Sequence, residues 1–431
     1  SRERKNIKPV PPRGAAPYRW YWDTPMQLSP HDPSTLYVTA NKVFKSTDRG
    51  DTWQVISPDL TAQVDRDTIP IMGVMGRDIA IARNDGVSVY GAILSFAESS
   101  KRAGLFISGA DDGTVYVSRD NGANWTNVTT RFPGLPKFAA VSRVALSSHD
   151  EGTAFATFDN HSANDFAPYV YISTDFGTTW RAITTGIPAG QTVRTITEDL
   201  KNPNVLYVGT EFGLFVSLNK GTQWIRVKAN LPTVPIAEIT LHPRDNDMLL
   251  ATHGRSIWIL DDISAFQQAS TAMASAAYLF DIRAATSFNP GSFRPAFGSP
   301  GDRRFWGKNP EMGAAVTYYL RGPAQSVSAR VTDASGAVVR ELGADDFAGK
   351  MSAGVNRLQW DLRHQPIPDS LVSGGGRSGG TAPFVLPGTY RVAMTVDGRD
   401  AGTKSVTVNG DPLSVITDAD RKLWHDLSLA V

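Results

Sequence analysis

The chain has 431 residues, 41% of them hydrophobic, so it is long enough to bury more than one hydrophobic core. Its 43 basic and 42 acidic residues leave a formal net charge of +1, and no basic stretch resembles an arm that follows a phosphate backbone, so nucleic acid is not expected as a partner. The absence of cysteine excludes disulfides, thiolate catalysis and cysteine-ligated zinc.

An eight-residue phrase, Ser-x-Asp-x-Gly-x-x-Trp, recurs four times in the first half of the chain. Each copy lies between two short apolar runs, which predicts a strand, a tight turn and a second strand. Glycine can take the positive φ of the turn, the serine and aspartate oxygens can accept hydrogen bonds from the N–H groups of the loop, and the tryptophan can cover it. These residues are therefore expected to stabilise turns. The four copies, the last with Asn in the acidic position, comprise Ser46, Asp48, Gly50, Trp53; Ser118, Asp120, Gly122, Trp125; Ser173, Asp175, Gly177, Trp180; and Ser217, Asn219, Gly221, Trp224.

This phrase resembles the Asp-box, or bacterial neuraminidase repeat, of sialidases, sortilin-type propellers and two-propeller xyloglucanases. The resemblance implies that each phrase joins the outer strands of a β-propeller blade, far from the propeller axis. We therefore predict that residues 1–262 form about five blades, within the usual range of propellers. The unit at 236–260 has no box, and residues 4–10 resemble the strand that follows a box tryptophan although no box precedes them. Either this strand completes the fifth unit, or the chain is a piece of a longer protein, so that preceding blades or another polypeptide cover the open edges; we favour the second.

The second half of the chain shows a different pattern. Residues 263–285 are alanine-rich and predict a connector with a short helix. Residues 286–410 contain short stretches of alternating polarity, which predict an immunoglobulin-like β-sandwich. Residues 411–431 contain the start of a helix with an apolar stripe. The predicted fold class is all-β, with propeller blades followed by the sandwich.

Nearly the whole chain resembles exported bacterial proteins described as sortilin-like or as repeat-containing glycosyl hydrolases. That resemblance implies an exported location, either periplasmic, at the cell surface or extracellular. The hydrolase description in that group depends on the boxes, which we interpret as structural. No signal peptide and no apolar run long enough to span a membrane are present in the sequence.

The sequence offers few residues with the pattern of a catalytic site. Glycoside hydrolysis needs two carboxylates across a cleft. Several acidic residues could supply them, although a turn position explains the Asp111–Asp112 pair more simply. The seven histidines show no paired spacing, so neither a metal site nor a cofactor is expected. We assign no catalytic residue. The acidic candidates are Glu98, Asp111, Asp112, Glu198, Asp261 and Asp262.

Four residues are candidates for ligand binding. Arg143 and Arg194 occupy equivalent positions on the first strands of adjacent units, which places two guanidinium groups near the axis. A third arginine at a matching position is missing, so sialidase activity is not expected. Trp20 and Trp22 precede the first complete blade and could stack on a sugar or contact a protein, although burial between blades is the simpler interpretation.

The sequence alone therefore favours a non-catalytic, exported interaction or scaffold protein. Its propeller would bind a protein, a peptide or an assembly of the cell envelope, because the loops on one propeller face converge while the blades stay fixed. The alternative is an endo-acting glycoside hydrolase of the two-propeller type, for which carbohydrate is the ligand. Paired carboxylates facing one cleft would favour the enzyme.

Overall fold

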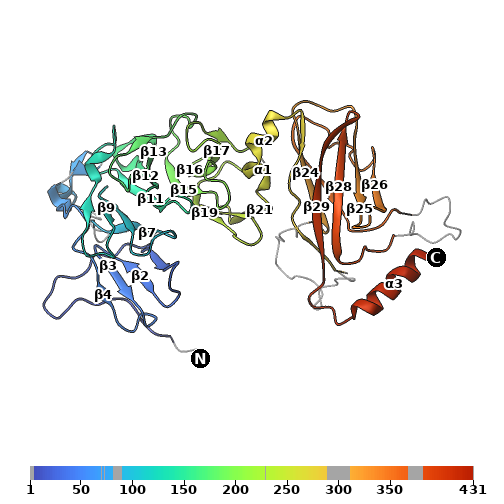
Figure 1. Ribbon diagram of the computed structural model, residues 1–431. Helices are drawn as coiled ribbons and strands as arrows, with labels where there is room; N and C mark the ends of the chain where they lie inside the picture. The colour runs from blue at the N-terminus through green and yellow to red at the C-terminus, as the bar shows by residue number, and fades with distance from the viewer. Residues whose placement is uncertain are drawn as a thin grey trace. The chain divides into compact units, whose positions relative to one another are not determined.

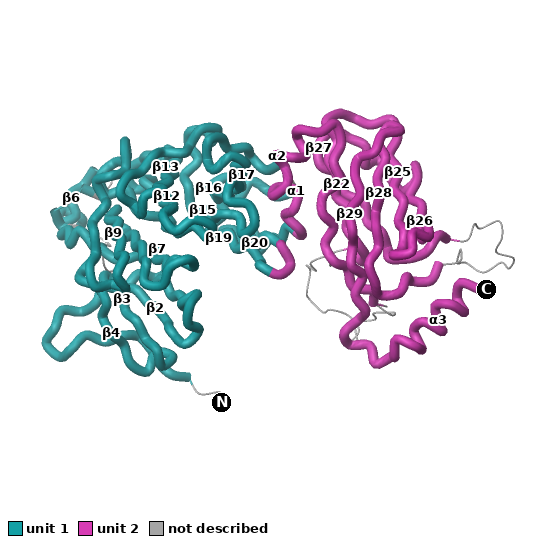
Figure 2. The backbone as a smooth tube through the Cα atoms, in the orientation of Figure 1, with its two compact units in different colours: residues 1–243, 247–260 teal, residues 244–246, 261–431 magenta. Residues whose placement is uncertain are grey.

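The structure is a computed structural model that describes residues 4–68, 70–71, 73–80, 90–228, 230–288, 311–366 and 382–430 (Figure 1). Two compact units divide the chain (Figure 2). The first comprises residues 1–243 and 247–260, and the second comprises residues 244–246 and 261–431. Strands and loops make up nearly all of both units, so the fold is all-β, as the sequence predicts.

The first unit contains five successive antiparallel sheets in chain order, and the short hairpin β5 (Pro70–Ile71) and β6 (Val74–Met75) lies between the first two. The strands of each sheet are also in chain order. They are β1 (Met26–Leu28), β2 (Leu36–Thr39), β3 (Val43–Ser46) and β4 (Gln54–Val55); β7 (Ile93–Glu98), β8 (Phe106–Ala110), β9 (Val115–Ser118) and β10 (Thr126–Asn127); β11 (Ala140–Leu146), β12 (Ala154–Asn160), β13 (Asp165–Ser173) and β14 (Arg181–Ala182); β15 (Val193–Glu198), β16 (Leu206–Thr210), β17 (Gly213–Ser217) and β18 (Ile225–Arg226); β19 (Ile236–Leu241), β20 (Met248–Thr252) and β21 (Ile257–Leu260).

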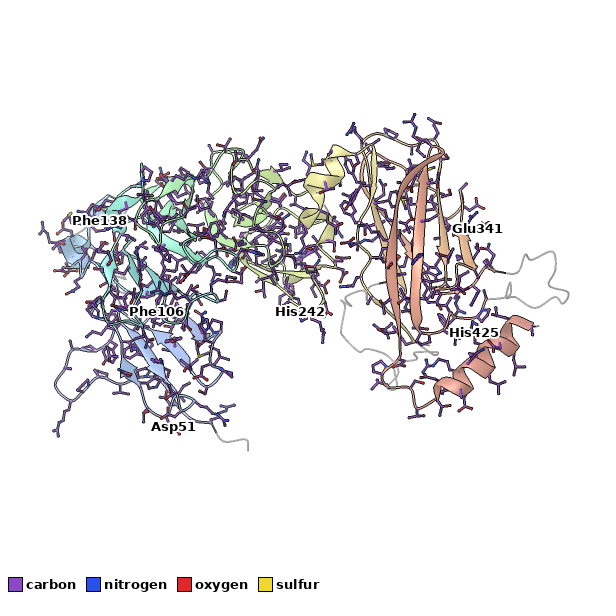
Figure 3. All side chains as sticks on the ribbon, viewed as in Figure 1. Asp51, Phe106, Phe138, His242, Glu341 and His425 are labelled. Carbon is purple, nitrogen blue, oxygen red and sulfur yellow. The ribbon has the colours of Figure 1, made fainter. Side chains whose placement is uncertain are left out.

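Neighbouring sheets pack through their first strands, as propeller blades do. Strands β7 and β11, β11 and β15, and β15 and β19 contact one another in turn. Two glycines permit this close approach: a Cβ on Gly109 would lie 2.3 Å from the Val141 side chain, and one on Gly209 would lie 2.6 Å from the Ile236 carbonyl oxygen. Buried aliphatic and aromatic side chains, including Phe106, fill the space between the sheets (Figure 3). The first unit is therefore a set of β-propeller blades.

The N-terminal segment differs from the expectation. Residues 4–10 form no strand, because they pair with no strand of the described chain. The segment instead lies against the first box, where the Trp53 indole donates a hydrogen bond to the Ile7 carbonyl oxygen over 2.7 Å. Trp125 donates in the same way to Ile56, and Trp224 to Ile183, each the residue that follows the last strand of the preceding sheet. These tryptophans therefore join a box to the segment that precedes it.

The four box turns share one hydrogen-bond pattern. In the third copy, the Ser173 hydroxyl accepts from the Gly177 N–H over 2.9 Å and donates to the Asp175 carboxylate over 2.8 Å. Asp175 also accepts from the Thr179 N–H over 2.8 Å. Phe176 and Gly177 have φ of 60° and 77°, the left-handed region that a glycine adopts without strain. The aspartate oxygens are therefore engaged within their own turn, and no box lies among the loops described below as a candidate site.

Ser173→Ala is expected to lower the free energy of unfolding by about 1–3 kcal/mol, because it removes a buried hydroxyl that organises the turn. Ser173 is 2% exposed. Chemical denaturation measures the change. Ser335→Ala is the matched control: its hydroxyl also donates to the aspartate of a turn, Asp333, but it is exposed, so a change within about 0.5 kcal/mol is expected. Equal losses in the two variants would contradict this assignment.

The second unit contains two sheets that share one hydrophobic core. Leu279, Val316, Trp360, Val331 and Val392 are among its buried residues. Short helices α1 (Ser264–Gln267) and α2 (Ala269–Ala274) precede the sheets, and α3 (Asp418–Ala430) follows them. The sheets contain, in spatial order, β22 (Ala277–Leu279), β24 (Ala314–Leu320) and β27 (Gly354–Trp360); and β23 (Ala285–Ser287), β29 (Arg399–Gly410), β28 (Gly388–Val396), β25 (Val327–Thr332) and β26 (Val338–Leu342).

The segment expected to be a connector is partly built into this unit. Residues 277–279 pair with β24, and residues 285–287 pair with β29. Leu279 and Phe280 are each 1% exposed, so burial of apolar side chains draws the segment onto the sheets. On α3, His425 contacts His364, and their Nε2 atoms lie 2.9 Å apart (Figure 3). No helix within the described residues is long and apolar enough to cross a membrane.

Candidate functional site

One end of the propeller sheets carries three acidic side chains on successive sheets. Successive strands in each sheet run in opposite directions, so the loops after the second strands lie at the same end as the segments that join one sheet to the next. The box turns lie at the opposite end. Asp111, Asp159 and Glu211 lie in or beside the loops after β8, β12 and β16. Loops that converge from rigid blades are the usual place for a binding site.

Asp111 has the most unusual environment at this end. It is 9% exposed, and one carboxylate oxygen accepts hydrogen bonds from the N–H groups of Gly91 over 2.9 Å and Ala92 over 2.8 Å. Burial has the largest effect on the pKa of Asp111 and raises it. The charge of Asp112 raises the pKa further, and the two hydrogen bonds lower it. The net effect raises the pKa of Asp111 to about 6. This carboxyl group can therefore hold a proton near neutral pH, as a general acid must.

The neighbouring Asp112 has a structural role. Its two oxygens accept hydrogen bonds from the Ala62 N–H over 2.7 Å and from the Thr114 hydroxyl over 2.7 Å. It is 2% exposed and ties the segment before β7 to the turn after β8. The sequence places both aspartates in a turn between blade strands, and both lie there, but only their different burial and partners distinguish them.

The charge of Asp111 acts on two tyrosines, Tyr21 and Tyr90, and the charges of two further aspartates act on Tyr21 as well. The pKa of Tyr21 is raised above its usual range. Burial is the largest cause, and the negative charges of Asp111, Asp23 and Asp159 raise the pKa further. Burial likewise raises the pKa of Tyr90, and the charges of Asp112 and Asp111 raise it further. The Tyr21 hydroxyl is thus close enough to three carboxylates to be influenced by each. We refer to Tyr21, Asp23, Tyr90, Asp111 and Asp159 as the acidic cluster.

The two arginines that the sequence nominates for binding are paired with acids. Arg194 contacts Asp159 over 2.8 Å and Glu211 over 2.7 Å. Arg143 forms an ion pair with Glu238, and its Nε donates to the Thr195 hydroxyl over 3.2 Å. Both arginines lie on first strands, Arg143 on β11 and Arg194 on β15, and neither is an uncompensated cation for an anionic sugar. Their carboxylate partners explain why a sialidase-like arginine cluster does not form.

Arg19 supports the cluster and was not predicted from the sequence. Its guanidinium donates to the Gly91 carbonyl oxygen over 2.9 Å, to Asp59 over 2.7 Å and to the Thr61 hydroxyl over 2.7 Å. Gly91 in turn donates its N–H to Asp111. Arg19 therefore fixes the backbone that positions Asp111. Its partners lie 40 to 72 residues away in the chain, so no local pattern could have identified it.

The other acidic candidates lie outside the cluster. Glu98 and Glu198 are the last residues of β7 and β15, at the end that carries the boxes. Glu198 accepts from the Ser147 hydroxyl over 2.8 Å and from the Ser148 N–H over 2.8 Å, and Glu98 accepts from the Gly104 N–H over 3.1 Å. Asp261 and Asp262 belong to the second unit. Glu98 and Glu198 therefore serve the structure where they lie.

The two candidate tryptophans have different environments. Trp20 is half-buried and stacks on Phe44, with 5.7 Å between ring centroids, while the Lys8 ammonium lies 4.9 Å from its ring centroid. Trp22 is 81% exposed, so the expectation of burial between blades is wrong for this residue. Both line a groove of about 420 Å³, together with Tyr21 of the acidic cluster.

Among the described residues, no group of three or more potential metal ligands occurs.

Comparison with known proteins relates the chain to two curated enzymes. It is 23% identical over 349 residues to the probable oligoxyloglucan-reducing end-specific xyloglucanase of Neosartorya fischeri, a match that covers 68% of this chain and 41% of that protein. It is 28% identical over 190 residues to a xyloglucanase of Paenibacillus sp., covering 38% of this chain and 16% of that protein. The chain therefore spans less than half the length of either relative. No protein-family model matches it.

Among solved structures, the chain is similar to the GH74 xyloglucanase from Xanthomonas campestris, with a TM-score of 0.42 and 19% identity over 55% of this chain and 36% of that chain. The two curated relatives overturn the preference for a non-catalytic scaffold that the sequence had suggested, because both are named as enzymes. That preference was wrong in taking the structural role of the boxes as evidence against an enzyme. The comparisons favour the alternative, a glycoside hydrolase.

Proposed function

We propose that this chain is part of a glycoside hydrolase that cleaves the glucan backbone of xyloglucan or a closely related β-glucan. The observation that carries the proposal is the acidic cluster, in which the buried Asp111 carboxyl, whose pKa is raised, and the carboxylates of Asp23 and Asp159 all act on the Tyr21 hydroxyl. The names of both curated relatives support the substrate class. A carboxyl that holds its proton beside one that is ionised is the pairing that glycoside hydrolysis requires.

In this proposal, Asp111 is the general acid and protonates the glycosidic oxygen as its bond to the anomeric carbon breaks. Asp23 is exposed, and its charge acts on the same tyrosine as that of Asp111. It is the carboxylate that attacks the anomeric carbon or activates a water molecule to do so. Asp159 is less suited to this role, because Arg194 and His161 engage its two oxygens at 2.8 Å and 2.6 Å.

The proposal extends to where the protein works and to its family. Xyloglucan is a polymer too large to cross a membrane unaided, so we infer that the protein is exported. The box phrase and its hydrogen-bonded turns support membership among Asp-box propellers. The two sheets of the second unit, which share one core, support an immunoglobulin-like sandwich, although β23 adds a parallel pair to the antiparallel pattern of that fold.

The test is an assay of the purified protein against xyloglucan, carboxymethylcellulose and mannan, with new reducing ends measured over time. Xyloglucan should be cleaved fastest, and mannan should stay intact. Asp23→Asn should abolish cleavage, whereas Asp120→Asn, in the second box at the opposite end of the blade, should retain it. Failure to release reducing ends from either glucan would reject the proposed function.

A further inference from the structure

Helix α3 lies on the second unit with a polar side inward and its apolar side outward. Leu423, Trp424 and Leu427 form the apolar side and are 60%, 70% and 58% exposed. No residue of α3 is buried. Because the helix buries no apolar side chain, the hydrophobic effect contributes little to its position, which depends on the polar groups that face the rest of the unit.

His425 makes the polar contact between α3 and the rest of the unit. Its Nε2 lies 2.9 Å from Nε2 of His364, which follows β27, and the ring centroids are 5.0 Å apart, so the two rings meet nearly head-on (Figure 3). A zinc ion between them would need about 2 Å to each nitrogen, which this arrangement does not leave. Within the described residues, no other hydrogen bond joins a side chain of α3 to a residue before Thr417. We refer to His364 and His425 as the histidine pair.

The hydrogen bond of the histidine pair depends on protonation. One imidazole donates an N–H, and the other accepts with an unprotonated nitrogen. When both rings carry a proton on each nitrogen, neither Nε2 can accept, and two positive charges face each other at hydrogen-bonding distance. The contact therefore exists only while at least one of the two histidines is neutral.

Two arginines add positive charge next to the histidine pair. Arg421 lies one turn before His425 on α3 and against Gly410 at the end of β29, and its Nε is buried without a hydrogen-bond partner. Arg340, on β26, donates to the His364 carbonyl oxygen over 3.1 Å. Their charges disfavour a second proton on the pair. Further charged groups nearby are Arg363, beside His364 in the chain; Asp346, 3.7 Å from Arg340; and Lys422, which pairs with Asp426.

Two acids act in the opposite direction. Asp426 lies 3.1 Å from Nδ1 of His425, but it is exposed and shared with Lys422. Burial, and next the charge of His425, lower the pKa of His364, whereas the charge of Asp333 in the turn after β25 raises it. The net effect holds the pKa of His364 below its ordinary value of 6.5. Because a lowered pKa favours the neutral form in the folded state, the contact is fully present above that value and is lost as the pH falls below it.

We infer that the histidine pair is a pH-sensitive switch that holds α3 on the second unit at neutral pH and releases the helix in acid. The inference goes beyond the proposed function and does not depend on it. A free helix of 13 residues is only marginally stable in water, so release also unfolds α3. The two sheets keep their own hydrophobic core and stay folded.

Hydrogen exchange of the backbone amides, measured on the full chain, tests the switch. Protection is compared at about pH 7.5 and about pH 5, on either side of the range in which histidine titrates, after correction for intrinsic exchange rates. The amides of α3 should lose protection at least about tenfold at the lower pH, whereas those of β28 should keep theirs and show that the unit is folded. His425→Gln keeps a neutral hydrogen-bonding group, so α3 should stay protected at both pH values. His425→Lys carries a permanent charge, so α3 should be unprotected at both.

The control and the contrary outcomes are as specific. His253→Gln is the matched control, because His253 is exposed and lies in the first unit, so its pH response should equal that of the unmodified protein. Equal protection of α3 at the two pH values in the unmodified protein would overturn the switch. A loss in acid that persists in His425→Gln would assign the response to Asp426 or Asp333 and overturn it as well. If Zn²⁺ alone protects α3 through His425 while acid changes nothing, the pair is a metal site and the inference is wrong.

Discussion

Replacing Asp111 with asparagine is expected to reduce the rate of xyloglucan cleavage by about 10²–10⁴-fold, the contribution that a general acid usually makes. Asparagine keeps a side-chain oxygen that can accept from the Gly91 and Ala92 N–H groups, so the loop should keep its conformation. It cannot supply a proton to the glycosidic oxygen. Initial rates of reducing-end release, measured at saturating xyloglucan, give the effect on turnover.

The Asp112→Asn variant is the control that shows whether a loss of activity comes from losing the acid or from damaging the loop. Asp112 lies next in the chain and is also buried, but its two oxygens accept hydrogen bonds from the Ala62 N–H and the Thr114 hydroxyl. A loss of activity in this variant should therefore accompany a loss of stability. A folded Asp111→Asn protein with the activity of the unmodified protein would show that Asp111 is a structural residue of the turn.

The rate of cleavage is expected to decline on the alkaline side of about pH 6. Because burial raises the pKa of Asp111 to about 6, the group is protonated below that pH and loses its proton above it. Only the protonated form can act as the acid, so the rate should fall about tenfold for each pH unit well above the pKa. A pH profile of kcat/KM measures this limb, because that ratio reports the pKa of the protein without bound substrate.

The Asp111→Asn protein provides the control for the pH profile. Its residual activity should lack the limb near pH 6, because the group that titrates there has been removed. A profile that keeps the same alkaline limb in this variant would assign the limb to another residue. A limb near pH 4 in the unmodified protein would show that the carboxyl is not desolvated as the structure describes.

The blades could be predicted from the sequence because their signals are local. Ser173, Asp175, Gly177 and Trp180 lie within one turn, and their hydrogen bonds span no more than four residues. The apolar runs on either side of each box define the strands in the same way. The short strands β22 and β23 were missed because three residues give too little alternation to distinguish a strand from a loop.

The acidic cluster could not be predicted from the sequence, because it is formed by residues far apart in the chain. Tyr21, Asp111 and Asp159 come from three different parts of the propeller and share no motif. The sequence named Asp111 among its acidic candidates, but what distinguishes it from Asp112 is its set of partners, the N–H groups of Gly91 and Ala92, which lie about 20 residues earlier in the chain. Burial at the meeting point of several loops depends on the packing of the blades. The interpretation of the boxes as structural gave no information about the opposite end of the sheets.

The most direct test of the account is a crystal structure of the Asp111→Asn protein with a xyloglucan oligosaccharide. The expected result is a glucan backbone on the blade end that carries the acidic cluster, with a glycosidic oxygen within hydrogen-bonding distance of residue 111. An oligosaccharide bound at the box turns, on the second unit or elsewhere away from Asp111 and Asp23 would contradict it.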